Sequence, residues 1–271
     1  MVAPAHVEFF RSFLKNHSGY MLEQGKEYIL ESKLHHIIAT VGCADIGELV
    51  VLLQRDARGP AAQILLQAMT INETMFFRDN TPFSQLERNI MPALIDREGK
   101  REISIWCTAC SSGQEPYSIA MLLDEQKKNY PPCRFRIFAS DLSGPMIEKG
   151  KEALYTDFEV ARGLSEERRD RYMERVGAAW RVRAPIREMV TFEAMNLLQI
   201  KPHIGPFDLV FCRNVLIYFD TARKISVLND IRKTMRNGGY LLTGASEVID
   251  GLTPYFRMYP DADWRGVYQA V

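Results

Sequence analysis

The segment Ile103–Ser118 has the composition of a ligand-binding turn. It runs from the apolar stretch Ile103–Cys107 through small residues to Gly113 and then to a helix near Pro116, where proline is well tolerated. In doubly wound sheets, ligands bind where parallel strands end. A dinucleotide site would need several glycines to approach the pyrophosphate, and here Gly113 is essentially alone. The segment predicts a ligand with a nucleoside and an amino-acid tail, as in S-adenosylmethionine; an ordinary strand–turn–helix is the alternative.

A carboxylate follows the next strand-like run. Asp141 closes the segment Phe138–Asp141, at the place where an acidic residue of dinucleotide folds accepts the ribose hydroxyls. The alternative is that Asp141 caps the N-terminus of the following helix. The turn around Gly113 followed by a carboxylate at Asp141, in this order, favours a bound nucleoside.

Two further blocks place polar side chains beside apolar ones. In Asn72–Asp79, Arg78 follows two phenylalanines and could hold a carboxylate with its planar fork, although a plain domain interface would look similar. In Cys212–Phe219, polar Arg213, Asn214 and Tyr218 interrupt an apolar run. Buried polar groups are destabilising without partners, so this block predicts a ligand or substrate nearby.

The elements that would position these blocks form two domains. Apolar residues recur at helical spacing throughout residues 1–70, which predicts a small all-α domain. Residues 71–92 read as a linker and junction, and residues 93–271 as an α/β domain. Strands are expected at 102–107, 134–139, 208–212 and 240–243, with helices at 116–123, 145–150 and 221–235. This alternation predicts a Rossmann-like parallel sheet covered on both faces. An antiparallel edge strand is expected at 265–269, and a helix plus hairpin inserted at about 165–189.

The composition excludes several classes of protein. The chain has 271 residues with 34 basic and 34 acidic side chains, so no net charge attracts nucleic acid or anionic membranes. It shows neither a secretory signal nor an apolar run of about 18 residues. Five cysteines, an odd number, favour reduced thiols in the cytoplasm. Cys107 and Cys110 lack the further ligands of a zinc site, and we expect no metal.

Taken together, these blocks resemble the CheR family of chemotaxis-receptor methyltransferases. The likeness covers nearly the whole chain. It rests on Thr-x-Phe-Phe-Arg at 74–78, Gly-Gln-Glu-Pro-Tyr-Ser at 113–118, Ala-Met-Asn-Leu-Leu at 194–198, Cys-Arg-Asn-Val-x-Ile-Tyr-Phe at 212–219, and the run 239–247. The resemblance implies a Rossmann-like S-adenosylmethionine-dependent fold with an inserted β-subdomain. It also implies methyl transfer to receptor glutamates, with S-adenosylhomocysteine as the second product.

The resemblance also implies the roles of individual residues. Arg78 and Tyr218 would face the incoming carboxylate. The residues expected to contact the cofactor are Asn72, Thr74, Arg78, Glu115, Asp141, Asn196, Leu197, Arg213 and Asn214. The expected partner is the helical-bundle cytoplasmic domain of chemoreceptors, met by a cytoplasmic monomer that neither binds nucleic acid nor inserts into the membrane. Relatives that bind a receptor tail peptide have a longer glycine-rich hairpin loop. Here the stretch 175–180 is short with a single glycine, which predicts that no such tether is bound tightly.

Two other functions fit less well. DNA amino-methyltransferases carry Asp/Asn-Pro-Pro-aromatic after the fourth strand, where this chain has Cys212–Phe219; its Pro131-Pro132 pair precedes the second strand. A non-catalytic sensor of the cofactor would have no use for the carboxylate clamp of Arg78 and Tyr218.

Overall fold

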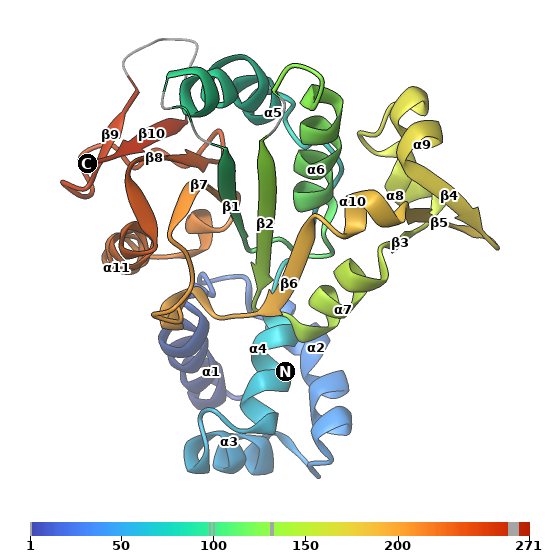
Figure 1. The fold of residues 1–271 in the computed structure, drawn as a ribbon. Coiled ribbons are helices and arrows are strands. Elements are labelled where there is room, and N and C mark those ends of the chain that lie inside the picture. The colour runs from blue at the N-terminus through green and yellow to red at the C-terminus, as the bar shows by residue number, and fades with distance from the viewer. Residues whose placement is uncertain (1, 98, 100, 131–132, 260–265) are drawn as a thin grey trace.

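The computed structural model describes residues 2–97, 99, 101–130, 133–259 and 266–271 (Figure 1). Over residues 2–70 it has four helices, α1 (Pro4–Ser18), α2 (Glu27–Val41), α3 (Ile46–Arg55) and α4 (Pro60–Met69). Their apolar faces share one core, which includes Phe10, Leu14, Leu30 and Leu65. Proline in the first turn and left-handed glycine after the last one mark helix ends here, as at Pro4 and Gly19.

The larger domain is built on a seven-stranded sheet, in the order β6-β2-β1-β7-β8-β10-β9 within the described residues. Its first five strands are parallel, and β10 runs antiparallel to both of its neighbours, β8 and β9. The bounds are β1 (Glu102–Thr108), β2 (Arg134–Asp141), β6 (Val190–Ala194), β7 (Phe207–Cys212), β8 (Met235–Thr243), β9 (Phe256–Met258) and β10 (Val267–Ala270). The predicted α/β class is confirmed. Strands β6 and β9 were not predicted, and Arg265 and the pair Pro131-Pro132 lie outside the described residues.

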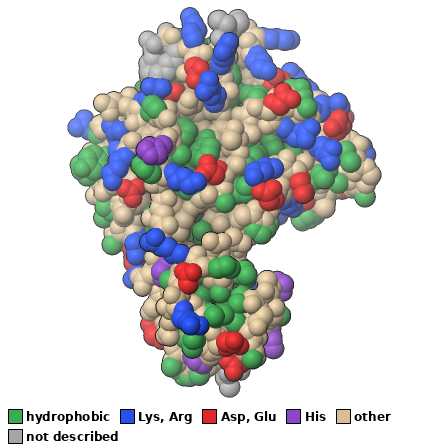
Figure 2. All heavy atoms as spheres, turned by 60° about the horizontal axis from the view of Figure 1, so that its bottom comes forward, with side chains coloured by type: hydrophobic (Ala, Val, Ile, Leu, Met, Phe, Trp, Pro, Cys, Tyr) green, Lys and Arg blue, Asp and Glu red, His purple; other side chains and the backbone are tan. Residues whose placement is uncertain are grey.

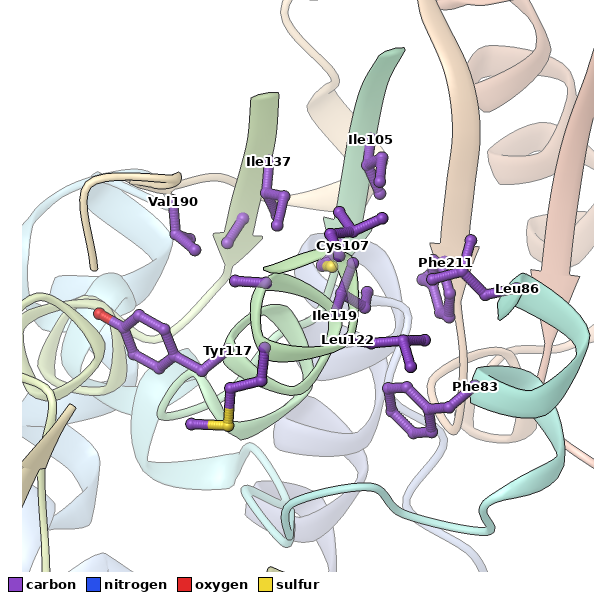
Figure 3. Packing of buried hydrophobic residues seen from close by; sticks show 14 of the residues in the cluster. Phe83, Leu86, Ile105, Cys107, Tyr117, Ile119, Leu122, Ile137, Val190 and Phe211 are labelled. Carbon is purple, nitrogen blue, oxygen red and sulfur yellow. The ribbon is translucent and has the colours of Figure 1, made fainter. Parts of the chain in front are cut away.

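Both faces of the sheet are covered, because successive strand residues belong to different cores. Ile105 packs into the core that contains α6 (Gln114–Gln126), whereas the neighbouring Trp106 packs into the core of α11 (Thr221–Lys233). Figure 3 shows the first core, where Ile119 and Leu122 of α6 point toward the sheet. Helix α7 (Gly144–Glu152) follows β2. Helix α6 begins at Gln114, two residues before the predicted Pro116.

The second half of the junction between the domains is helical, from Thr81 onward. It contains α5 (Thr81–Gln85) and the π-helical turns η1 (Leu86–Ile90) and η2 (Ala93–Arg97), so one helical run crosses the expected boundary at residue 92. Phe83 packs on Phe211 of β7 with ring centroids 6.4 Å apart (Figure 3). This contact fixes the segment that carries Arg78 to the sheet.

The inserted subdomain has a three-stranded antiparallel sheet, β3-β5-β4, in the described residues. Its strands are β3 (Leu154–Tyr155), β4 (Met173–Val176) and β5 (Ala179–Val182), with short helices α8 (Asp157–Ala161), α9 (Glu166–Tyr172) and α10 (Ala184–Arg187). The insertion therefore starts earlier than the predicted residue 165, because Tyr155 pairs with Trp180. Figure 1 shows it projecting from one side of the main sheet.

The outer surface carries no dominant charge. In Figure 2, Lys and Arg side chains are interspersed with Asp and Glu over the visible face, and the N-terminal domain forms a separate lobe below a narrower waist. No single helix in the described parts of the chain is long and apolar enough to cross a membrane. Helices α2 and α3 reach that length only as a pair bent by 69°.

Candidate active site

A pocket lies where the two domains meet and where β1, β2 and β7 end. It encloses about 1020 Å³ of empty space, including solvent at its opening. The structure brings all the residues singled out from the sequence to its lining: Asn72, Thr74, Arg78, Glu115, Asp141, Asn196, Leu197, Arg213, Asn214 and Tyr218. These residues come from five segments far apart in the chain, so the fold assembles one site from all the polar blocks.

Asp141, the last residue of β2, is buried and points its carboxylate at backbone amides. Its Oδ2 accepts the N–H of Ser111 at 2.8 Å and its Oδ1 accepts the N–H of Ser143 at 2.8 Å. Ser143 is the N-cap residue of α7, so the capping alternative for Asp141 is wrong. Burial raises the pKa of Asp141, and the amide bonds oppose that rise. Each oxygen keeps a further lone pair, which suits the two hydroxyls of a ribose.

Replacing Asp141 with asparagine is expected to weaken S-adenosylmethionine binding by about 10- to 100-fold. In wild type both carboxylate oxygens accept backbone N–H groups. The asparagine amide has only one acceptor oxygen, so its NH2 group would face one of these N–H donors. Isothermal titration calorimetry measures the change, with the exposed Asp157→Asn as the matched control. A Kd within about twofold of wild type would contradict a role in ribose binding.

Arg213 links three of these five segments. Its side chain is 1% exposed, and it donates to Glu115 Oε2 at 2.7 Å, to Asp79 Oδ2 at 2.8 Å and to the carbonyl oxygen of Arg78 at 3.0 Å. Burial raises the pKa of Glu115, while Arg213 acts against that rise. The guanidinium therefore neutralises a buried carboxylate and fixes the backbone of Arg78.

Arg78 and Tyr218 are less buried than Arg213 and leave donors open. Arg78 donates from Nη1 to the carbonyl oxygen of Glu73 at 2.9 Å, and no carboxylate among the described residues pairs with it. Tyr218 ends the 3-10 turn η4 (Leu216–Tyr218). Burial raises the pKa of Tyr218, and the nearby Arg78 lowers it by less, so the phenol stays protonated at neutral pH. Both groups can donate to an anion.

Backbone strain is concentrated around this pocket. Non-glycine residues with positive φ include Asp79 (69°), Ala109 (48°), Ser111 (49°) and Asn214 (57°). Such conformations are unfavourable for L-residues and persist where the surroundings enforce them, often at functional sites. Three separate pocket loops show this feature, which supports a functional site here.

Glu247 fixes the loop that carries Asn214 and Tyr218. Its Oε2 accepts the N–H groups of Asn214 and Gly244, both at 2.7 Å, and its Oε1 accepts those of Val215 and Ile217 at 2.9 and 3.2 Å. The sequence placed Glu247 in a loop after the β8 strand but gave it no role. The carboxylate sets the path of the chain between β7 and α11.

The N-terminal domain also lines the pocket, which the sequence did not predict. Ser18 and Tyr20, at the end of α1 and in the α1–α2 connection (residues 19–26), face it. The His17 carbonyl oxygen accepts a hydrogen bond from Asn196 Nδ2 at 2.7 Å, and Met21 N–H donates to the Tyr218 carbonyl oxygen at 3.1 Å. This segment carries no polar motif, and only the docking of the domains brings it to the site.

Replacing Gly19 with alanine is expected to destabilise the protein. Gly19 has φ 77°, and an added Cβ would lie 2.7 Å from two ring atoms of Phe219. Gly25→Ala is the matched control, because its φ is 83° and nothing lies within 4 Å of the added Cβ. Both variants bear the left-handed backbone penalty of about 1 kcal/mol. Thermal unfolding should show a larger loss for Gly19→Ala; equal losses would contradict the close contact.

Comparison with known proteins identifies the chain. The model of the CheR methyltransferase all-alpha domain matches residues 5–70, and that of the CheR methyltransferase SAM binding domain matches residues 72–263. The chain belongs to the CheR methyltransferase family. It is 42% identical over 260 residues to chemotaxis protein methyltransferase 1 of Pseudomonas aeruginosa, covering 94% of each chain. It is 30% identical over 264 residues to the chemotaxis protein methyltransferase of Salmonella typhimurium, covering 95% of this chain and 88% of that one.

As a CheR-family protein, the chain is an S-adenosylmethionine-dependent methyltransferase. The pocket fits this cofactor, because Asp141 offers free acceptor positions for a ribose. The described residues contain no group of three or more His, Cys, Asp or Glu side chains that could hold a metal ion.

Proposed function

We propose that this CheR-family enzyme transfers the methyl group of S-adenosylmethionine to glutamate side chains of chemoreceptors, giving glutamyl methyl esters. It would act in the cytoplasm, as a monomer, on the helical-bundle domain of the receptor. The observation that carries the proposal is Arg78: its guanidinium lines the cofactor pocket without a carboxylate partner among the described residues, whereas Arg213 has two. The names of the relatives, chemotaxis protein methyltransferases, support the receptor as substrate.

Different lining residues would contact different parts of the cofactor. Asp141 would hold the ribose, and Asn196 with Leu197 would contact the adenine. Six further lining residues would also contact the cofactor: Asn72, Thr74, Arg78, Glu115, Arg213 and Asn214. When bound, the cofactor supplies an activated methyl group on a sulfonium sulfur.

The protein's contribution to the chemistry would be positioning. A glutamate carboxylate is already ionised at neutral pH, so no general base is needed. Arg78 would hold the carboxylate with its fork, and Tyr218, protonated because burial raises its pKa, would fix the angle by donating a hydrogen bond from its hydroxyl to the carboxylate. Aligned reactants shielded from water react much faster than free ones, which accounts for rate enhancement without acid–base catalysis.

We further propose that receptor methylation here does not depend on a tightly bound receptor tail peptide. The hairpin between β4 and β5 supports this, because Val176 pairs with Ala179 and only Gly177 and Ala178 form the turn. Titration with a receptor C-terminal peptide should show no binding at micromolar concentrations. A micromolar Kd would contradict this part of the proposal.

The deciding experiment uses methyl-labelled S-adenosylmethionine and cytoplasmic receptor fragments. Label that enters the receptor and is released as methanol by mild base would establish carboxyl methylation, because esters hydrolyse where methylated nitrogens do not. Receptor fragments with the methyl-accepting glutamates changed to alanine serve as the control. Cofactor binding without any transfer to receptor would contradict the proposal and favour a sensor of the cofactor.

A further inference from the structure

Tyr218 sits on a short turn that has little structure of its own. Residues Leu216–Tyr218 form a single 3-10 turn, and Glu247 fixes the backbone on one side by accepting the N–H of Ile217. That hydrogen bond sets the chain path but does not touch the Tyr218 ring. A ring on a single turn can rotate about its side-chain bonds unless a neighbour packs against it.

The α1–α2 connection supplies that neighbour from the N-terminal domain. The ring of Tyr20 packs on the ring of Tyr218, with centroids 6.0 Å apart and planes inclined by 38°. The distance is within the range of favourable aromatic pairs. Tyr20 is half-buried and lines the same pocket as Tyr218. The two phenols therefore form adjacent parts of the wall, one from each domain.

Neighbouring contacts hold the two segments in register. Met21 N–H donates to the Tyr218 carbonyl oxygen at 3.1 Å, and Lys15 pairs with Asp220 at 2.9 Å. Gly19 lies close enough to the Phe219 ring that no side chain fits between them. Contacts on 218, 219 and 220 in succession leave the Tyr20 ring little freedom to move away from Tyr218.

We propose that Tyr20 is a positioning residue for methyl transfer, because its ring fixes the orientation of the Tyr218 ring. The N-terminal domain thereby takes part in the active site. This inference rests on the proposed role of Tyr218 in aiming the substrate carboxylate. The hydroxyl of Tyr20 itself is not required, since the contact is between rings.

A double-mutant cycle tests this dependence. Tyr20→Ala should lower kcat about 10-fold in the wild-type background, as expected for a misaimed group, with the Kd of S-adenosylmethionine changed less than about twofold. In the Tyr218→Ala background the same change should lower kcat less than about twofold, because the ring it orients is gone. Tyr20→Phe keeps the ring and should restore most of kcat. Tyr255→Ala, a tyrosine 46% exposed in the sheet domain, is the matched control.

Two kinetic outcomes would overturn the proposal. Equal losses from Tyr20→Ala in both backgrounds would mean that Tyr20 acts independently of Tyr218. A Tyr20→Phe variant as slow as Tyr20→Ala would mean that the hydroxyl, not the ring, matters.

A spectroscopic readout separates this inference from the proposed function. In protein labelled with 3-fluorotyrosine, the ¹⁹F resonance of Tyr218 is assigned by its loss in Tyr218→Phe. Tyr20→Ala should shift or broaden that resonance, and Tyr255→Ala should leave it in place. If wild type transfers no label to receptors, the proposed function fails, and this signal still decides the role of Tyr20. An unchanged Tyr218 resonance in Tyr20→Ala would overturn it.

Discussion

Replacing Arg213 with alanine is expected to destabilise the folded protein by about 3–5 kcal/mol, the usual loss when one partner of a buried ion pair is removed. The side chain of Arg213 is 1% exposed, and that of its partner Glu115 is 14% exposed. Without the guanidinium, the largely buried Glu115 carboxylate would lose its ion-pair partner and keep only the weaker attraction of Arg78, and the carbonyl oxygen of Arg78 would lose a donor. Urea unfolding followed by circular dichroism measures the change.

The loss should depend on pH in a definite direction. Burial already raises the pKa of Glu115 above its ordinary value of 4.5, and removing Arg213 raises it further. The folded variant then holds a proton that the unfolded chain releases, so its stability falls as pH rises above 4.5 through the raised pKa. Relative to wild type, the deficit should shrink on acidification. The matched control is Arg175→Ala, which breaks an exposed pair with Asp157 and should change little at any pH. A deficit that is the same at every pH would contradict the charge argument.

Replacing Arg78 with alanine is expected to lower kcat about 100-fold or more on receptor glutamates. The substrate carboxylate would lose its planar two-point contact and sample unproductive orientations, which commonly reduces rates by that factor. The Kd of S-adenosylmethionine should change by less than kcat does. Single-turnover transfer of label, with cofactor binding measured in parallel, separates the two effects.

Two further variants make this prediction specific. Arg78→Lys keeps the charge without the fork and should recover only part of kcat. Arg162→Ala removes a nearby cation that pairs with Glu73 and does not line the pocket, so it should leave kcat close to wild type. If Arg78→Ala and wild type turned over at the same rate, the proposed role of Arg78 in holding the substrate carboxylate would be wrong.

Much of the site could be predicted because it follows a rule of sheet geometry. Asp141 ends a strand, Arg213 and the loop before Glu115 each come directly after one, and the ends of parallel strands lie along one edge. The alternating order of strands and helices then predicted the α/β class. Arg78 was predicted as a site residue because it lies at the junction between the helical segment and the strand-rich segment.

The parts that were missed depend on tertiary contacts. Strand β6 carries Thr191 and Glu193 and is held as an edge strand by pairing with β2, and two-residue β3 exists only because β5 lies beside it. Tyr20 looks like an ordinary loop aromatic until the N-terminal domain docks on Tyr218. Glu247 binds amides some thirty residues away in sequence, at 214 to 217, which no local pattern signals.

Because the α1–α2 connection contacts the sheet domain at the active site, the two domains of one enzyme must fit each other. A hybrid gene that joined the first seventy residues of one relative to the remainder of another would keep the hydrophobic cores of both domains intact, since each domain has its own. In its product, the residues that contact the rings at 218 and 219 would come from a different relative, and the two sides of the contact would not have evolved together. Such a chimaera would fold, but its activity would be low because the pocket wall would be misshapen. Its activity would be recovered by exchanging only residues 17 to 21.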